Sequence, residues 1–202
     1  GDVWTHTLLL LGEMHSPSPT LAWAGLLHDV GKPPTFRIEG RIRFDNHAEV
    51  GAHMAAAILT RLRFSNDEIR RVEELVASHL RFKDIVHMRP STLKRFLRLE
   101  HFDAHLELHR LDCVSSHRDL AHYMFAKTKL AEYSAEQLKP PPLLRGGDLI
   151  REGFMPGPRF GQVLHAVEDA QLDGRIHSRE DALALVRCLL APTSEGTTQG
   201  DT

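Results

Sequence analysis

Six histidine and aspartate side chains fall where the sequence otherwise predicts an apolar core or a helix end beside it. They are His6, His28, Asp29, His47, His79 and Asp112. A buried imidazole or carboxylate is energetically costly unless it is paired, hydrogen-bonded or bound to a metal ion. Imidazole nitrogens combined with carboxylate oxygens suit Mn, Fe, Ni, Co, Zn or Mg, and Ca less well. One divalent ion that satisfies several of these groups at once is therefore one explanation for them.

The alternative is that these residues are ordinary core side chains with hydrogen bonds to the protein. A lone histidine on an apolar face is usually of that kind, and an isolated His-Asp pair such as His28-Asp29 carries little information. The six residues are also spread from the first helix to the middle of the chain, so no local ligand spacing supports a metal site. Residue types alone leave both explanations open.

The elements that must position these residues are predicted helices. A helix over residues 2–15 carries His6 on its apolar face. A helix over residues 20–29 is apolar on nearly every side, which predicts a central, buried position. It ends at His28-Asp29, with Gly31 as its stop signal.

Later helices carry the remaining candidates. The sequence Asn46–Glu49 has the pattern of a capping box that opens a helix at His47, and Ser65–Glu68 repeats this pattern. The helix after Ser65 carries His79 in register with its apolar stripe, and a long helix over residues 102–116 carries Asp112. Residues 35–44 predict a short hairpin or an irregular loop.

The pattern as a whole predicts an all-α fold. We expect a helical bundle over residues 1–139, a small C-terminal helical region over 140–191 and a disordered tail over 192–202. Pro140-Pro141-Pro142 is the clearest linker between the first two.

Composition limits the function classes. The net charge of -2, from 25 basic and 27 acidic residues, excludes a general basic coat for nucleic acid, so any RNA contact must be local. Local candidates are Arg37, Arg41 and Arg43, and the short basic helix with Lys94, Arg95 and Arg98. Cys113 and Cys188 form no C-x-x-C pair, which favours a reducing compartment, the cytoplasm. Apolar stretches end before membrane-spanning length, so no membrane partner is expected.

Several motifs, in order, resemble the HD domain and C-terminal region of bacterial CCA-adding tRNA nucleotidyltransferases and poly(A)-polymerase-like proteins. The motifs are Val3–Leu8, Leu26–Pro33, Phe44–Ala52, Val76–His79, Arg110–Cys113, Gly147–Leu149, Pro156–Gly161 and Ala170–Gly174. This resemblance covers residues 2–190. It implies an HD-type metal-dependent phosphohydrolase fold.

The resemblance also implies residue roles. His6, His28, Asp29 and Asp112 would hold a divalent ion. Asp29, Lys32, His47 and His79 would act in catalysis, Lys32 by neutralising phosphate charge and the two histidines as phosphate or acid–base groups. We favour one ion, with a second ion at His47 and His79 as the alternative. The reaction would be hydrolysis of nucleotide phosphate esters such as 2′,3′-cyclic nucleotides.

One departure from that family matters. Its members carry a nucleotidyltransferase head with a Gly-rich turn and paired aspartates, and Gly146-Gly147-Asp148 is not followed by such a pair. We therefore expect that this chain alone does not add nucleotides. The alternative function is the RNA-binding body of such a protein, with a structural or vestigial HD site and tRNA as partner. Gly157–Arg159 would then face RNA.

The other histidines are predicted to be less informative. His53 lies off the apolar stripe of its helix and should be exposed, and His87 is a weaker candidate for the site. His105 and His109 are interpreted as part of an exposed polar stripe.

Overall fold

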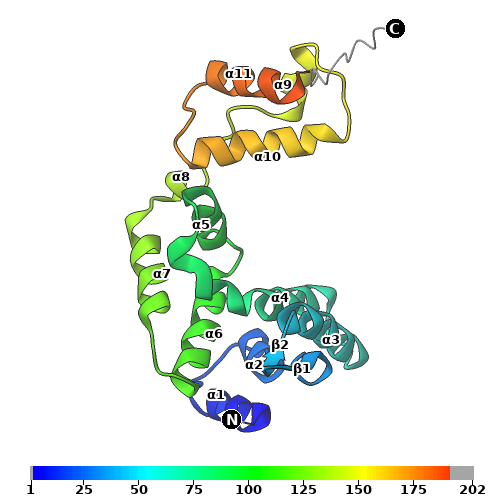
Figure 1. Cartoon of the computed structure of the whole chain (residues 1–202), viewed down its shortest axis with the longest axis vertical. Coiled ribbons are helices and arrows are strands. Elements are labelled where there is room, and N and C mark those ends of the chain that lie inside the picture. Colours follow the sequence, from blue (N-terminus) through cyan, green and yellow to red (C-terminus); the bar gives the residue numbers. More distant parts are fainter. Residues whose placement is uncertain (1, 192–202) are drawn as a thin grey trace, which may run out of the picture. The chain divides into compact units, whose positions relative to one another are not determined.

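A computed structural model describes residues 2–191, and these form helices apart from one short hairpin (Figure 1). The prediction of an all-α fold is confirmed. The chain divides into two compact units. The first comprises the residues up to His87 together with Leu99–Glu132, and the second comprises Met88–Arg98 and the residues from Tyr133 onward. This division differs from the boundary expected at residue 140, and the predicted disordered tail lies outside the described residues.

The first two helices begin where their caps are. Helix α1 (Val3–Gly12) starts after Asp2, whose side chain accepts a hydrogen bond from the Thr5 amide. Helix α2 (Pro19–Leu27) starts after Ser18, whose hydroxyl accepts from the Leu21 amide. Both helices end slightly earlier than predicted, so His28 and Asp29 follow α2 rather than lie within it.

The segment after α2 forms the predicted hairpin. A short 3-10 turn, η1 (Pro33–Thr35), leads into strands β1 (Phe36–Glu39) and β2 (Arg41–Phe44), which pair antiparallel with Phe36 opposite Phe44. Helix α3 (His47–Arg61) follows. Its N-cap Asn46 has a left-handed backbone, with φ of 60°, and makes no side-chain cap bond. The predicted capping box there is wrong, because side-chain capping requires an extended N-cap backbone.

Helix α4 (Asn66–Ser78) has the predicted capping box, because Ser65 and Glu68 bond reciprocally. The 3-10 segment η2 (His79–His87), helix α6 (Phe102–Ser115) and helix α7 (Ala121–Glu132) complete the first unit. Helix α4 packs against α2, α3 and α6. The buried apolar residues of this core are Ala24, Leu27, Ala52, Ala55, Leu59, Val72, Leu75, Val76 and Leu108.

The second unit has its own core. It contains helices α5 (Pro90–Leu97), α8 (Ala135–Leu138), α9 (Gly146–Arg151), α10 (Arg159–Leu172) and α11 (Arg179–Leu190). Helix α11 begins with the predicted Ser178 cap. The buried apolar residues are Leu144, Leu149, Val163, Val167, Ala170, Ile176, Ala182, Leu183 and Val186. No helix between residues 2 and 191 has the length and apolar character needed to cross a bilayer.

The basic side chains of α5 and of its C-cap residue Arg98 bind within the second unit. Lys94 Nζ donates to the Leu172 carbonyl at 2.7 Å. Arg95 and Arg98 each donate to the Glu168 carboxylate at 2.5 Å. These contacts attach α5 to α10 and explain why a segment from the middle of the sequence joins the C-terminal unit. They give the three cations a structural task, and the expected guidance of RNA by these residues stays a prediction.

Candidate metal centre

The side chains singled out in the sequence meet inside the first unit. Donor atoms of His6, His28 and Asp112 lie within 4.8 Å of one another, and so do those of Asp29, His47 and His79. We call these two adjacent groups together the His/Asp cluster. It draws on α1, the end of α2, the start of α3, the start of η2, and α6. All members except His6 and Asp112 are fully buried.

The Asp29 carboxylate joins the two groups. Its Oδ2 lies 3.3 Å from His28 Nε2 and 3.9 Å from His6 Nε2. Its Oδ1 lies 3.5 Å from His47 Nε2 and 3.9 Å from His79 Nε2. One carboxylate oxygen thus faces each group, so Asp29 would offer one oxygen to each if both groups held an ion.

Three buried histidines are oriented in the same way. Each places Nδ1 within hydrogen-bond distance of the carbonyl oxygen three residues earlier in the chain. The pairs are His28 with Gly25 at 2.8 Å, His47 with Phe44 at 2.8 Å, and His79 with Val76 at 2.6 Å. A carbonyl can only accept, so Nδ1 must carry the proton and donate. In the neutral imidazole each Nε2 is then an unprotonated ligand atom aimed at the cluster, as in metal-binding histidines.

The donor set fits a divalent ion. His6 Nε2 lies 3.2 Å from His28 Nε2 and 3.0 Å from Asp112 Oδ1. Such spacings of about 3 Å are expected for donor atoms about 2.1 Å from a shared ion. His47 Nε2 is buried and has no hydrogen-bond partner within the described residues. Facing nitrogen lone pairs and an orphaned buried nitrogen are unfavourable without a proton or cation between them.

The electrostatics keep the central carboxylate ionised. Burial works to raise the pKa of Asp29, but the close approach of His28 and His47 and the hydrogen bond from Lys32 outweigh it and hold that pKa well below its ordinary value. Lys32 Nζ donates to Asp29 Oδ2 at 2.5 Å. Burial lowers the pKa of His79 to about 4, so His79 is neutral at physiological pH.

Gly31 permits the close approach that brings His47 to Asp29. A Cβ atom on Gly31 would lie 2.1 Å from the His47 carbonyl oxygen and 2.6 Å from the Gly51 amide nitrogen. Both are backbone atoms that cannot move aside. The interpretation of Gly31 as a helix stop is therefore wrong: α2 already ends at Leu27, and the glycine serves tertiary packing.

Two histidines expected to be exposed are buried. His105 and His109 are only 5% and 6% exposed. His105 Nδ1 lies 2.7 Å from Ser78 Oγ, and the His109 ring stacks on Phe82 with centroids 4.3 Å apart. Their helical spacing from Phe102 is the signal that could have identified them. His53 is largely exposed, as predicted.

A cavity of about 290 Å³ adjoins the His/Asp cluster. We call it the histidine pocket. Its lining residues are His79, Lys83, His109, Asp112, Cys113, His117, Asp119 and His122. His79 and Asp112 belong to both features. The sequence analysis did not identify the other six as site residues. They come from η2, α6, the segment before α7 and the first turn of α7, and only the packing of these elements brings them together.

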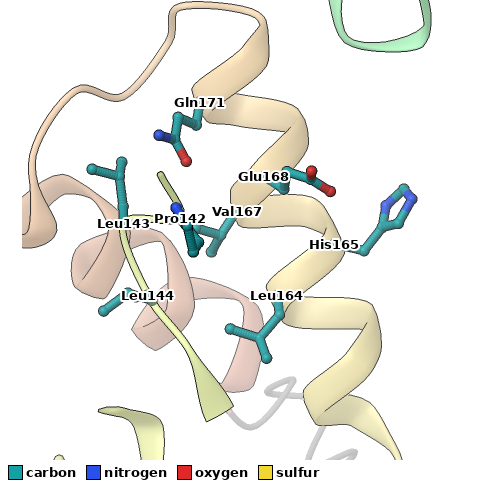
Figure 2. Close-up of a pocket in the computed structure, with 8 residues that line it drawn as sticks. All are labelled: Pro142, Leu143, Leu144, Leu164, His165, Val167, Glu168 and Gln171. Atoms are coloured by element: carbon teal, nitrogen blue, oxygen red, sulfur yellow. The ribbon is translucent and has the colours of Figure 1, made fainter. Parts of the chain in front are cut away.

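A second cavity lies entirely within the second unit. It has a volume of about 310 Å³ and lies between the segment Pro142–Leu144 and α10 (Figure 2). Its lining is mainly apolar, with His165, Glu168 and Gln171 as polar members. Gln171 Nε2 donates to the Pro141 carbonyl at 2.8 Å. Among residues 2–191, no lysine or arginine lines this cavity.

Comparison with known proteins matches residues 3–100 to the family described as HD domain. The A-adding tRNA nucleotidyltransferase of Deinococcus radiodurans is 33% identical over 202 aligned positions, which cover 92% of this chain and 46% of that protein. The CC-adding tRNA nucleotidyltransferase of Thermus thermophilus is 36% identical, covering 91% and 44%. The multifunctional CCA protein of Legionella pneumophila strain Lens is 30% identical, covering 48% and 24%. The chain thus spans about half the length of its two more extensive matches.

Proposed function

We propose that this chain, whose residues 3–100 match the HD domain family, is a metal-dependent phosphohydrolase whose His/Asp cluster is the active site. The single observation that carries this proposal is the shared orientation of His28, His47 and His79. Each donates Nδ1–H to the backbone and leaves Nε2 free around the Asp29 carboxylate. Histidines that merely fill a core have no reason to present three unprotonated nitrogens to one carboxylate.

In this proposal His6, His28, Asp29 and Asp112 hold a first divalent ion. The sequence favoured a single ion, with His47 and His79 as phosphate or acid–base groups. The bridging position of Asp29 and the unpartnered His47 Nε2 support the alternative, a second ion held by Asp29, His47 and His79. When bound, a divalent ion supplies a water of lowered pKa and polarises a phosphoryl oxygen. The metal identity is one of Mn, Mg, Ni, Fe, Co or Zn.

The protein's own residues perform the remaining tasks. Lys32 is 24% exposed and reaches Asp29 with its ammonium, so one side of that cation remains available to a phosphate oxygen. Asp29 stays ionised and fixes both the ligand histidines and Lys32. The substrates would be nucleotide phosphate esters, of which 2′,3′-cyclic nucleotides are one class. The lysine would offset part of the substrate's negative charge as it develops in the transition state.

The test combines metal content with hydrolysis. Purified protein is expected to contain a divalent metal and to hydrolyse bis-p-nitrophenyl phosphate or 2′,3′-cyclic AMP. Asp29→Ala should lose both properties, because Asp29 touches both groups of the cluster. His53→Ala is the matched control, since His53 is 74% exposed on α3. Wild-type protein that hydrolyses neither ester with any of these metals would overturn the proposal.

A second candidate function is the RNA-holding body of a nucleotidyltransferase, with a structural or vestigial metal site. The similarity to the A-adding and CC-adding tRNA nucleotidyltransferases over 92% and 91% of this chain supports it. In that case the partner is tRNA, and removal of the metal lowers stability without ending a reaction. Tight tRNA binding combined with no ester hydrolysis would favour this candidate over the hydrolase.

A further inference from the structure

The histidine pocket lies directly beside the proposed active site. His79 and Asp112 line it on the side of the His/Asp cluster, and Lys83, His117 and His122 are among the other lining residues. Its volume of about 290 Å³ is at the lower end of small-molecule sites, which span roughly 300–1,000 Å³. A pocket of this size suits one sugar-sized group and not a length of polymer.

Hydrogen bonding fixes the chemistry of two lining groups. His117 Nδ1 accepts from the Asp119 amide at 3.0 Å. An accepting Nδ1 requires the tautomer with the proton on Nε2, so His117 offers an N–H donor. The Asp119 carboxylate accepts from the Ala121 amide at 2.9 Å at the start of α7. Its charge is therefore partly satisfied by the helix end.

Lys83 is the cation of this pocket. It is exposed, and no acidic side chain within the described residues forms an ion pair with it. Lys32, by contrast, is paired with Asp29. His109 stays neutral in the same lining because burial lowers its pKa to about 4. The pocket thus combines the Lys83 ammonium, which forms no ion pair with any described residue, with the Asp112 and Asp119 carboxylates and with imidazoles that can bond hydroxyl groups.

We propose that the histidine pocket holds the leaving group of the phosphate ester, and that Lys83 selects substrates with a second anionic group on a hydroxyl-bearing, ribose-sized moiety. This inference rests on the proposed function. The scissile phosphate would lie at the His/Asp cluster, which shares His79 and Asp112 with the pocket. The second anion would lie toward Lys83. Lys83 is thus a specificity-determining residue and takes no part in bond cleavage.

A pair of substrates that differ by one phosphate tests the kinetic consequence. One substrate is 2′,3′-cyclic AMP, and the other is the same nucleotide with an added 5′-phosphate. For wild type and variants we would measure kcat/KM on both substrates and take the ratio of the 5′-phosphorylated substrate to the other. Lys83→Ala should lower this ratio about fivefold, as expected for loss of one exposed ion pair worth about 1 kcal/mol. Lys83→Arg should retain most of the preference. Lys127→Ala is the control, because Lys127 is an exposed lysine on α7 outside the lining.

A binding measurement separates this inference from the proposed function. Calorimetry compares adenosine 3′,5′-bisphosphate with adenosine 3′-monophosphate on the full chain, with and without Mn²⁺. We expect wild type to bind the bisphosphate more tightly than the monophosphate, and Lys83→Ala to abolish this difference. That result supports the pocket inference even if no ester is hydrolysed and the hydrolase proposal fails. If Lys83→Ala leaves both the kinetic ratio and the binding difference at wild-type values, the pocket inference is overturned while hydrolysis stands.

Discussion

His6 Nε2 lies 3.0 Å from Asp112 Oδ1, which joins the first helix of the chain to α6. The two residues are remote in sequence, and nothing in their local surroundings requires them to meet. Their contact completes the His6, His28 and Asp112 group beside Asp29. Had Asp112 faced another part of the unit, the four-ligand metal interpretation would have failed.

A substitution in one group of the His/Asp cluster should remove the ion of that group and leave the ion of the other group in place. We expect His47→Ala to lose one ion relative to wild type and to retain the ion at His6, His28 and Asp112, because His47 contacts only the Asp29 Oδ1 side. Elemental analysis of the purified proteins measures this. His53→Ala, on the same helix, should keep the wild-type content. An unchanged content in His47→Ala would exclude His47 as a ligand.

Metal affinity should fall as the pH is lowered. Burial works to lower the pKa of His28, but its hydrogen bond with Asp29 and the Asp29 charge outweigh this and raise it above 6.5. Ligand nitrogens must be unprotonated, so protons compete with the metal below that raised pKa. Calorimetric titration with Mn²⁺ from about pH 5.5 to about pH 8.5 should show rising affinity and proton release on binding. Affinity independent of pH would contradict His28 as a ligand.

In the metal-free protein, the stability contributed by His28 should change with pH in the opposite direction and fall as pH rises. A raised histidine pKa contributes stability that is fully present below the unfolded-state value of 6.5 and is lost as pH rises through the folded-state pKa. Unfolding of chelator-treated protein measures this. His79 acts in the opposite direction: its folded-state pKa of about 4 lies below the unfolded-state value of 6.5, so its contribution to stability is present above pH 6.5 and is lost as pH falls from 6.5 toward 4.

Lys32 should act on the substrate and not on metal retention. We expect Lys32→Gln to lower kcat/KM for 2′,3′-cyclic AMP by about 100- to 1,000-fold, as for removal of one group that stabilises transition-state charge. Its metal content should remain, since the Asp29 carboxylate and the histidines are unchanged. Lys127→Gln serves as the control. Wild-type kinetics in Lys32→Gln would confine Lys32 to its ion pair with Asp29.

Gly31→Ala should destabilise the first unit strongly. The added methyl would overlap the His47 carbonyl oxygen and the Gly51 amide, so the start of α3 must move away from Asp29. We expect a loss of about 3 kcal/mol in the free energy of unfolding, together with weaker metal binding. Urea denaturation measures the first effect. Gly12→Ala is the matched control, because its Cβ meets nothing within 4 Å, and it should be neutral or stabilising.

Glu168→Gln should weaken the second unit without affecting the metal. Burial works to raise the pKa of Glu168, but its bonds with Arg98 and Arg95 lower it below 4.5. The resulting stability is present above pH 4.5 and is lost as pH falls through the lowered pKa. We expect a loss of about 1 kcal/mol at neutral pH that shrinks in acid. Urea unfolding at several pH values measures the difference in unfolding free energy between wild type and Glu168→Gln. A difference that stays constant with pH would refute this prediction.

Local features of this protein were predictable because local interactions produce them. The Ser65–Glu68 and Ser178 caps lie within a few residues of the amides they satisfy, so sequence alone identified the starts of α4 and α11. The predicted cap at Asn46 was wrong because its backbone is left-handed, and the neighbouring start of α3 packs closely against Gly31, which is remote from the cap pattern in the sequence. The hydrophobic period likewise predicted the all-α fold.

The sequence by itself supplied the donor types, His28-Asp29 and the other imidazoles and carboxylates, and the helices that carry them. Only the tertiary structure decided that Asp29 turns one oxygen to each group, that His105 and His109 are buried, that α5 joins the second unit, and that Lys83 lines a pocket beside Asp112. The physical reason is that the residue type fixes a side chain's chemistry, and residues close in sequence decide whether it lies in a helix. Its distance to a partner depends on how whole helices pack, which is set by the volumes of all the residues between them.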